Sequence, residues 1–309
     1  MKKPTNSQWC PLIWWNGSVV PLEAATISVT SETALRGVNV FEGLRVYCCP
    51  STGRRRIPGL DAHLARLSAS SEVLQLVVPG LVGLIRDGIF DLIGMLADMG
   101  DLYLRPTIYL NEGPYTSDPS LRDVGAFVAA RPVDTGGVPA AITCAVSTWR
   151  RMDDLTLPPT TKVGAAYAAF RLARLEAVTR GAEEAILLNG RGTVAETGGA
   201  CIFVVKNGHV ATPPLEDGVL DGVTRRISIE ILEEHLGVEV QERSVLRSEL
   251  YVADEVFVCG TLDEIRPVRD IDSHAMREAP GPITSELSRL YIAACRGETH
   301  AVAHWFWEG

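Results

Sequence analysis

The sequence lacks any long hydrophobic run and any extended basic cluster. No stretch of about eighteen uninterrupted apolar residues occurs, which is roughly what a membrane-spanning helix requires. The longest basic run is Arg54-Arg55-Arg56, and the formal net charge is −9. Nucleic-acid-binding proteins typically carry a strongly basic surface. The sequence therefore predicts neither a membrane span nor a nucleic-acid partner, although a local pocket on an acidic protein can still be positive.

Metal-ligand patterns are also missing. The chain has seven cysteines, but no Cys-x-x-Cys motif and no His/Cys pair at ligand spacing, so no zinc site is expected. The adjacent Cys48 and Cys49 permit a redox role, but we favour a chance pairing in a strand. Residues 1–15 lack the length and cleavage pattern of a signal peptide. Together with cysteines set in apolar strand patterns, this favours a reducing cytoplasm.

Length and composition indicate two globular domains. The chain has 309 residues, of which 46% are hydrophobic and 22% charged, and a domain typically spans about 150 residues. A Gly- and Pro-rich stretch at 131–139 separates two strand patterns. We expect an N-terminal domain over 1–130, a linker over 131–140 and a C-terminal domain over 141–309.

Local patterns predict alternating strands and helices. Asn16-Gly17 between apolar runs predicts a hairpin over 13–22, and Glu42-Gly43 interrupts a strand pattern over 38–47. Apolar spacing and turn residues predict the other elements: helices over 60–76, 80–99, 164–180, 223–236 and 282–296, and strands over 101–110, 124–129, 141–147, 184–188, 193–196, 201–205, 209–212 and 255–259.

The strand over 101–110 has an unusual polar face. Successive side chains of a strand point to opposite faces. One face therefore carries Tyr103, Arg105, Thr107 and Tyr109, and the other carries leucine and isoleucine side chains. A phenol, a guanidinium and a hydroxyl on one face suit a strand that lines a polar pocket.

Lys162 and Glu196 are the main candidates for chemistry. Lys162 is the only lysine between Lys3 and Lys206, and it precedes an alanine-rich helix pattern. Glu196 ends a hairpin pattern and precedes two glycines. Either residue alone is most often a solvated surface residue. Pyridoxal chemistry, however, needs a lysine that holds an aldehyde and a carboxylate that faces a pyridine nitrogen.

A phosphate cup also has candidates. Gly222-Val223-Thr224 at a predicted helix start offers backbone N–H groups and a hydroxyl, and Gly260-Thr261 follows a strand. Arg66 adds a guanidinium. Singly, Thr224 is explained as a helix cap and Arg66 as a solvated helix charge.

Together these residues resemble the fold-type IV pyridoxal-phosphate aminotransferases, and most closely the branched-chain amino-acid aminotransferases. The resemblance runs from about Trp15 to Arg296. Its motifs are Val40-Phe41-Glu42-Gly43-Leu44-Arg45, His63-Leu64-Ala65-Arg66-Leu67, Tyr103-Leu104-Arg105-Pro106, Lys162 with Tyr167, Glu196, Gly222-Val223-Thr224-Arg225 and Gly260-Thr261-Leu262. It implies a two-domain α/β fold with a small N-terminal domain and a larger, barrel-like C-terminal domain. It also implies pyridoxal 5'-phosphate as cofactor, small amino-acid and 2-oxo-acid substrates with glutamate as default donor, and a homodimer.

The resemblance also implies a role for each site residue. Lys162 would bind the cofactor and transfer protons, Glu196 would face the pyridine nitrogen, and Tyr167 would bond the ring oxygen. The phosphate would be held by Arg66, Val223, Thr224 and Thr261. The substrate residues would be Tyr103 and the turn Thr261-Leu262 for the α-carboxylate, Arg105 for the side-chain carboxylate of glutamate, and Phe41 for apolar side chains.

Four features depart from the family pattern. Arg36 stands where a pocket tyrosine is usual. A buried unpaired guanidinium is costly, so Arg36 must meet solvent, a neighbouring carboxylate or an anionic substrate group, and we favour a partner such as Glu32. Leu262 replaces a small residue and Ala166 an asparagine, and the linker lacks the usual aromatic residues. Substrate specificity therefore stays open. The alternatives are a D-amino-acid aminotransferase or aminodeoxychorismate lyase on the same fold, and a non-catalytic paralogue.

Overall fold

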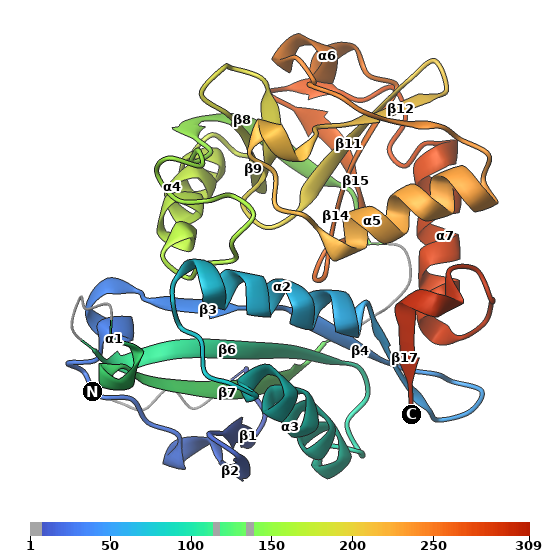
Figure 1. The fold of residues 1–309 in the computed structure, drawn as a ribbon. Helices are drawn as coiled ribbons and strands as arrows, with labels where there is room; N and C mark the ends of the chain where they lie inside the picture. The colour runs from blue at the N-terminus through green and yellow to red at the C-terminus, as the bar shows by residue number, and fades with distance from the viewer. Residues whose placement is uncertain (1–7, 114–117, 134–138) are drawn as a thin grey trace. The chain divides into compact units, whose positions relative to one another are not determined.

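The computed structural model describes residues 8–113, 118–133 and 139–309. Its contacts divide the chain into two compact units (Figure 1). The first unit comprises the described part of Met1–Thr135, with Thr161–Ala165 and Glu308–Gly309; the second comprises the described part of Gly136–Thr160, with Ala166–Trp307. The middle of the predicted linker, residues 134–138, lies outside the described residues, so the linker remains a prediction.

The first unit is built on one sheet, which has eight strands within the described residues. Their order is β17-β5-β4-β6-β7-β1-β2, and β3 pairs with β6. The bounds are β1 (Leu12–Trp15), β2 (Ser18–Pro21), β3 (Asn39–Phe41), β4 (Leu44–Cys48), β5 (Arg55–Pro58), β6 (Leu102–Glu112), β7 (Asp123–Pro132) and β17 (Phe306–Glu308). The predicted hairpin is confirmed: Trp15 pairs with Ser18 across Asn16 and Gly17, whose φ angles are 45° and 105°.

Two longer helices cover this sheet: α2 (Leu60–Val73) packs on β3, and α3 (Leu81–Met95) packs on β1, β2, β6 and β7. Gly88 of α3 allows the buried Trp14 to approach, because a Cβ there would lie 2.4 Å from the indole ring. Helix α3 ends before the predicted residue 99. There, Arg55 Nη2 donates to the carbonyl oxygens of Leu96, Ala97 and Met99, which satisfies the end of the helix from a neighbouring strand.

The second unit is built on a sheet with nine strands among the described residues, in the order β10-β9-β8-β15-β14-β11-β12-β13, with β16 on β15. The strands are β8 (Ile142–Arg150), β9 (Glu184–Leu188), β10 (Val194–Thr197), β11 (Cys201–Lys206), β12 (His209–Thr212), β13 (Val240–Glu242), β14 (Glu255–Gly260), β15 (Glu264–Ile271) and β16 (His274–Ala275). The helices are α4 (Ala166–Thr179), α5 (Val223–Glu230), α6 (Arg247–Val252) and α7 (Pro282–Arg296). Short 3₁₀ turns and the small helix α1 (Glu32–Arg36) complete the fold.

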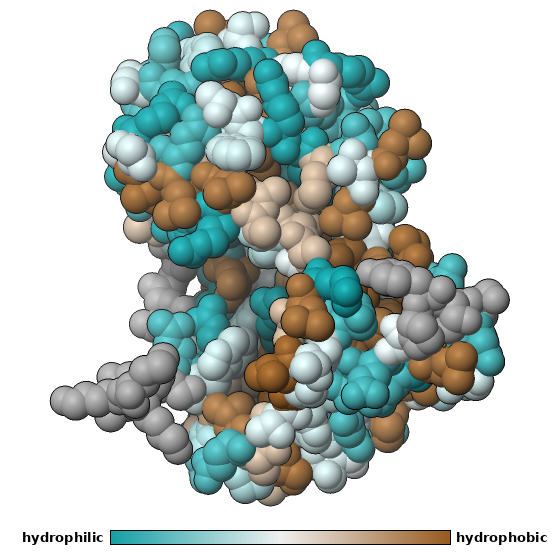
Figure 2. Space-filling model, turned by 90° about the vertical axis from the view of Figure 1, so that its left-hand side faces the viewer, coloured by the Kyte–Doolittle hydropathy of each residue, from teal (hydrophilic) through white to brown (hydrophobic). Residues whose placement is uncertain are grey.

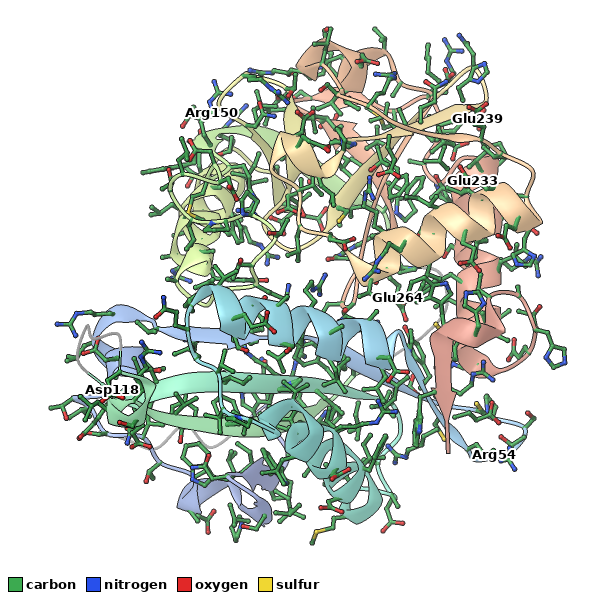
Figure 3. All side chains as sticks on the ribbon, viewed as in Figure 1. Arg54, Asp118, Arg150, Glu233, Glu239 and Glu264 are labelled. Carbon is green, nitrogen blue, oxygen red and sulfur yellow. The ribbon has the colours of Figure 1, made fainter. Side chains whose placement is uncertain are left out.

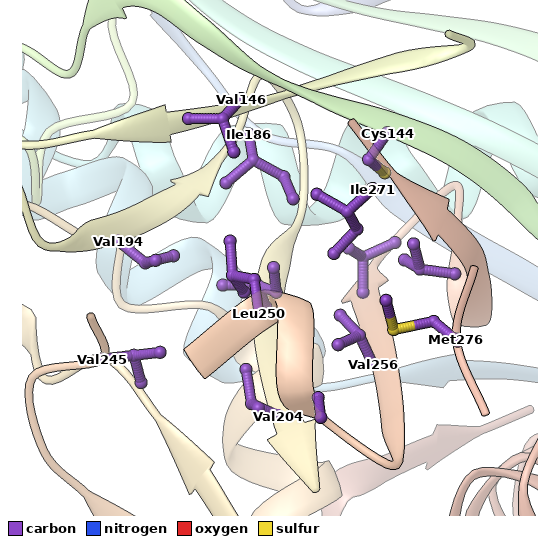
Figure 4. Packing of buried hydrophobic residues seen from close by; sticks show 14 of the residues in the cluster. Cys144, Val146, Ile186, Val194, Val204, Val245, Leu250, Val256, Ile271 and Met276 are labelled. Carbon is purple, nitrogen blue, oxygen red and sulfur yellow. The ribbon is translucent and has the colours of Figure 1, made fainter. Parts of the chain in front are cut away.

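An aliphatic core fills one face of the second sheet. Figure 4 shows Val146, Ile186, Val256 and Ile271 from four strands packed around Leu250 of α6. A second cluster, in which alanines of β8, β9 and α4 meet, lets α4 lie close to the sheet. These clusters fix β8, β9 and β10, which carry part of the candidate site.

The second unit differs from the predictions at one helix and one strand. The helix expected over 223–236 is α-helical only to Glu230 and continues as a π-helical turn, Ile231–His235. Strand β15 was not predicted, although it lies between β8 and β14 in the sheet. Its sequence contains Pro267, two arginines and an aspartate, which obscure the apolar pattern of a central strand.

The surface is mixed. On the face that Figure 2 shows, hydrophobic side chains are interspersed with hydrophilic ones. Among the residues that the structure describes, no helix is long and apolar enough to cross a membrane. All seven cysteines are free thiols; Cys48 is partly exposed at the end of β4, and burial raises the pKa of the neighbouring Cys49 thiol.

Candidate active site

The backbone around Lys162 is anchored within the first unit. The amide of Phe41 donates to the Lys162 carbonyl at 3.1 Å, and the Gly164 amide donates to the Asn39 carbonyl at 3.0 Å. On the other side, the Lys162 amide donates to Ser70 Oγ of α2 at 3.1 Å. The segment thus pairs with β3 and is held against α2, so regular secondary structure on both sides sets the position of the lysine backbone.

The Lys162 side chain shares an aromatic neighbour with Arg105. Its Nζ lies 5.2 Å from the centroid of the Phe41 ring, and the Arg105 guanidinium carbon lies 3.6 Å from the same centroid. Cations are attracted to aromatic faces at such distances. Three sequence-predicted site residues, from β3, β6 and the Lys162 segment, are therefore brought together.

Arg66 belongs to a buried charge cluster. Its Nε and Nη2 donate to Glu42 Oε1 and Oε2, both at 2.7 Å, and His63 Nδ1 lies 2.8 Å from Glu42 Oε2. Burial opposes the charge on Glu42, but the Arg66 guanidinium and His63 overcome it and hold the pKa of the carboxyl well below its usual range. Burial also lowers the pKa of His63. The alternative of a solvated helix charge is wrong for Arg66, because only 9% of its side chain is exposed.

Tyr103 lies on β6 with Arg105. It is buried, and Gly43 explains how its ring fits: a Cβ at Gly43 would lie 3.0 Å from the Tyr103 hydroxyl. The glycine of the Phe-Glu-Gly motif thus allows close approach of the β3–β4 turn to the phenol. Thr107 and Tyr109 on the predicted polar face are also buried.

The favoured partner of Arg36 is confirmed. Arg36 Nη1 donates to Glu32 Oε1 at 2.5 Å, one helical turn earlier in α1, and 48% of the arginine side chain is exposed. The pairing neutralises the guanidinium without a substrate.

Glu196 forms a buried ion pair within the second unit. Arg151 Nε donates to Glu196 Oε1 at 2.7 Å, and the Leu220 amide donates to Oε2 at 3.2 Å. Arg151 Nη2 also donates to the Pro159 carbonyl at 3.2 Å, and at most 7% of either charged side chain is exposed. Glu196 is thus a buried carboxylate that accepts hydrogen bonds at both oxygens, the type of group that partners the ring nitrogen in pyridoxal chemistry.

Sequence reasoning did not find Arg151. It follows β8 directly after Arg150, whose side chain points outward (Figure 3), and the two are a plain Arg-Arg pair in the sequence. Glu196 lies in the interval of β10, between Val194 and Thr197, where the pairing with β9 is irregular. The alternation of side chains along a strand was the one sequence feature that distinguishes Arg151 from Arg150, because it places them on opposite faces.

Phe170 links Tyr167 to the Arg151–Glu196 pair. Tyr167 lies in the first turn of α4, with its ring 5.2 Å from Phe170 in an edge-to-face arrangement. The Arg151 guanidinium carbon lies 5.0 Å from the Phe170 ring. Ala166, which replaces the family's asparagine, is a buried residue at the start of α4.

The N-terminus of α5 has the features of an anion site. Gly222 is the N-cap residue and offers no side chain to the first-turn amides, so the alternative of Thr224 as the helix cap is wrong. A Cβ at Gly222 would lie 2.8 Å from Cys201 Sγ, and one at Gly260 would lie 3.1 Å from the Gly199 carbonyl oxygen. Neither glycine therefore has room for a side chain: Gly222 lies against the Cys201 side chain and Gly260 against the Gly199 backbone. The first amides of α5, those of Val223 and Thr224, have no side-chain cap and are of the kind that bind a phosphate.

Thr261 and Leu262 form the turn after β14. Leu262 is 48% exposed and Thr261 is partly buried. Within the described residues, no group of three His, Cys, Asp or Glu side chains could hold a metal ion. The residue types present include a lysine, a buried carboxylate and helix-start amides without a side-chain cap, and these are the types that a phosphorylated pyridine requires.

Comparison with known proteins agrees with this chemistry. Residues 39–271 match the family model described as amino-transferase class IV. A probable branched-chain-amino-acid aminotransferase of Aquifex aeolicus is 36% identical over 299 residues, covering 94% of each chain. The branched-chain-amino-acid aminotransferase of Escherichia coli strain K12 is 32% identical over 304 residues, covering 96% of each chain.

Solved structures give the same result. A branched-chain amino acid aminotransferase from Thermobaculum terrenum in its PLP form has a TM-score of 0.90 at 34% identity, covering 98% of this chain and 99% of that one. A branched-chain aminotransferase from Thermoproteus uzoniensis with norvaline has a TM-score of 0.89 at 33% identity, covering 96% and 98%. The predicted two-domain α/β fold and pyridoxal-phosphate cofactor are confirmed. The chain therefore belongs to the class IV aminotransferases and is a pyridoxal-phosphate-dependent transaminase.

Proposed function

We propose that this enzyme transfers an amino group between a branched-chain-type amino acid and a 2-oxo acid, with glutamate as the usual donor. The observation that carries the proposal is the buried Arg151–Glu196 ion pair, in which the Arg151 guanidinium carbon lies 5.0 Å from the ring of Phe170, the aromatic neighbour of Tyr167. The names of the relatives support branched-chain substrates over the D-amino-acid and aminodeoxychorismate alternatives. Because both Lys162 and Glu196 are present, we favour an enzyme over a non-catalytic paralogue.

Three residues would act at the ring of the cofactor. When bound, pyridoxal phosphate supplies an electron sink for charge that develops at the substrate α-carbon. Lys162 would hold the aldehyde carbon and afterwards move the proton of the substrate α-carbon. Glu196 would accept a hydrogen bond from the ring nitrogen, and Tyr167 would donate one to the ring oxygen. Arg151 would hold the Glu196 carboxylate in position through the hydrogen bond to its Oε1.

The phosphate would be held by residues of two kinds. Val223 and Thr224 would donate backbone amides at the start of α5, and Thr224 and Thr261 would add hydroxyls. Arg66 would add charge, and its pairing with Glu42 fixes the plane of the guanidinium.

For the substrate, we propose that Tyr103 and the turn Thr261-Leu262 bind the α-carboxylate. Phe41 would contact apolar side chains, and Arg105 would meet the side-chain carboxylate of glutamate. We assign no substrate role to Arg36, because its pairing with Glu32 satisfies its charge. The exposed Leu262 would narrow the entrance on the carboxylate side.

We further propose a homodimer in the cytoplasm. Large apolar side chains are exposed in one segment of the first unit, namely Ile27 (41%), Val29 (83%) and Leu35 (60%), and a second copy would cover them. Seven free thiols suit a reducing compartment. Light scattering of the wild type and of Val29→Glu tests the dimer: the wild type should have twice the mass of one chain and the variant should dissociate.

The visible spectrum tests the cofactor assignments. The wild-type holoprotein should be yellow, Lys162→Ala should lose the visible band, and the matched variant Lys206→Ala should keep it. Lys206 is a suitable control because it pairs with Asp254 on the second unit's surface. An unchanged band in Lys162→Ala would refute the assignment of this lysine.

Substrate specificity needs a separate panel. Addition of leucine, isoleucine or valine should bleach the band of the wild type. If these three leave it unchanged while a polar or aromatic amino acid bleaches it, the branched-chain proposal fails and the cofactor assignments stand.

A further inference from the structure

Three neighbouring strands of the first unit place two arginines on either side of Tyr103. Arg45 of β4 and Arg131 of β7 are the register partners of Tyr103 of β6. Side chains directly opposite one another share a face of the sheet. The Arg131 guanidinium carbon lies 5.0 Å from the Tyr103 ring centroid, so Arg131 turns toward the phenol and not away from it.

Arg105 lies on the same face. It is two residues beyond Tyr103 on β6, and its register partner is Ala129, two residues before Arg131. Arg105 and Arg131 are therefore diagonal neighbours, with Cα atoms about 7–8 Å apart, which is within reach of two long side chains. Both are partly buried. Their guanidinium groups can meet the same small anion.

Neither guanidinium has a carboxylate partner among the described residues. The contacts found for Arg105 and Arg131 are with the rings of Phe41 and Tyr103. The chain has 38 acidic and 29 basic residues, so carboxylates are in excess. Arg66 and Arg151, for comparison, each pair with a carboxylate. Two like charges placed side by side without a counter-ion favour an anionic ligand.

An arginine that stacks on an aromatic ring can still donate hydrogen bonds. The flat face of the guanidinium contacts the aromatic ring, while its five N–H donors lie in the plane of the group and point outward from its edge. Arg131 can therefore stack on Tyr103 and donate to a carboxylate at the same time. A neutral residue of similar shape could stack as well, but it could not balance a negative charge.

We propose that Arg131 is a specificity-determining residue that, with Arg105, binds the second carboxylate of a dicarboxylic amino acid or oxo acid. The inference rests on the proposed function, which places the α-carboxylate at Tyr103 and the side-chain carboxylate at Arg105. It adds a second guanidinium for that distal group and selects acidic substrates over uncharged ones of equal length.

The test compares two pairs of ligands that differ only in the distal carboxylate. L-Glutamate and L-norvaline are compared by the rate of bleaching of the holoenzyme's visible band, and glutarate and valerate by their dissociation constants in calorimetry. The variants are Arg131→Gln, Arg131→Lys and the control Arg86→Gln, whose arginine pairs with Asp61 on α2. The visible band before ligand addition reports intact cofactor binding in each.

In Arg131→Gln, the bleaching rate with glutamate should fall and the dissociation constant for glutarate should rise, each about tenfold or more, because a charge-assisted hydrogen bond is lost. The bleaching rate with norvaline and the dissociation constant for valerate should stay within about twofold of the wild-type values. Arg131→Lys should keep part of the discrimination because it keeps the charge, and it remains informative should the glutamine variant fold poorly. Arg86→Gln should behave as the wild type.

Three outcomes would overturn the inference. If glutamate and norvaline are weakened equally, Arg131 acts at the α-carboxylate. If all four ligands behave as with the wild type, Arg131 is a structural residue. If Arg131→Lys is as defective as Arg131→Gln, the electrostatic argument fails. Failure of the proposed function looks different: the wild-type band would be absent, or no amino acid would bleach it.

Discussion

Arg151 and Glu196 form a buried ion pair of 2.7 Å although they lie 45 positions apart in the sequence. Replacing one partner leaves the other charge buried and unpaired, which typically costs about 3–5 kcal/mol. We therefore expect Arg151→Met to lower the free energy of unfolding of the cofactor-free protein by roughly that amount. Urea unfolding followed by circular dichroism measures it.

The double variant Arg151→Met/Glu196→Gln is the control for this pair. Removing both charges should restore a substantial part of the lost stability, because no unpaired ion remains. If the double variant is less stable than the sum of the two single changes predicts, the pair is not coupled as the geometry indicates.

Two glycines of α3 should respond in opposite directions to alanine. In Gly88→Ala the new Cβ would lie 2.4 Å from the ring of buried Trp14, so the helix or the indole must shift. Overpacking of this kind costs about 1–3 kcal/mol. Gly83 of the same helix has no atom within 4 Å of an added Cβ, and Gly83→Ala should stabilise by roughly 0.5–1 kcal/mol. Thermal midpoints of the two variants check the pair; stabilisation in both would contradict the packing at Trp14.

The Glu42 carboxylate should make stability depend on acid pH. Its pKa in the folded state is held below the unfolded value of about 4.3, so its contribution is complete above that value and is lost as the pH falls below it. The wild type should therefore lose roughly 1–2 kcal/mol more than Glu42→Gln between about pH 5 and pH 3. Urea midpoints measured across this range test it.

The matched control for Glu42 is Glu72→Gln, which removes an exposed carboxylate from the end of α2. This variant should retain the steep acid dependence of the wild type. If Glu42→Gln is as acid-sensitive as the wild type, the carboxylate is not the group that titrates.

Gly164 should be necessary for the placement of Lys162. A Cβ at Gly164 would lie 2.3 Å from Asn39 Oδ1, beside the hydrogen bond that joins the segment to β3. We expect Gly164→Ala to weaken cofactor binding and destabilise the protein by about 1–3 kcal/mol. Gly190→Ala, at a turn with nothing within 4 Å, is the control. Titration with pyridoxal phosphate, followed at the visible band, gives the affinity; equal affinities in both variants would argue against this role.

Local signals predicted much of the fold. The Asn16-Gly17 turn, the break at Glu42-Gly43 and the helix over 282–296 depend on residues close in sequence, and the structure agrees at each. The end of α3 depends on Arg55, more than forty residues earlier, and β15 depends on its two neighbouring strands. Such features are set by tertiary contacts, which a local pattern does not contain.

The sequence likewise predicted some residues of the candidate site and missed others. Lys162 and Glu196 stand in recognisable motifs, and their roles follow from resemblance. The sequence contains no such indication for Arg151 and Glu42. Arg151 is one of two adjacent arginines, and Glu42 precedes a glycine at a turn; their ion pairs, with Glu196 and with Arg66 and His63, appear only in the structure. Arg131 gave no signal before the strand register put it beside Tyr103.

The Lys162 segment has a consequence for dividing the gene. Residues 161–165 follow the first part of the second unit along the chain, yet by their contacts they belong to the first unit. A fragment that ends at Thr135 therefore lacks residues 161–165, which belong to its unit. The complementary fragment carries Lys162 without the β3 strand that holds it. If the two halves are expressed separately, Lys162 reaches its position only after residues 161–165 of the second fragment bind to β3 of the first.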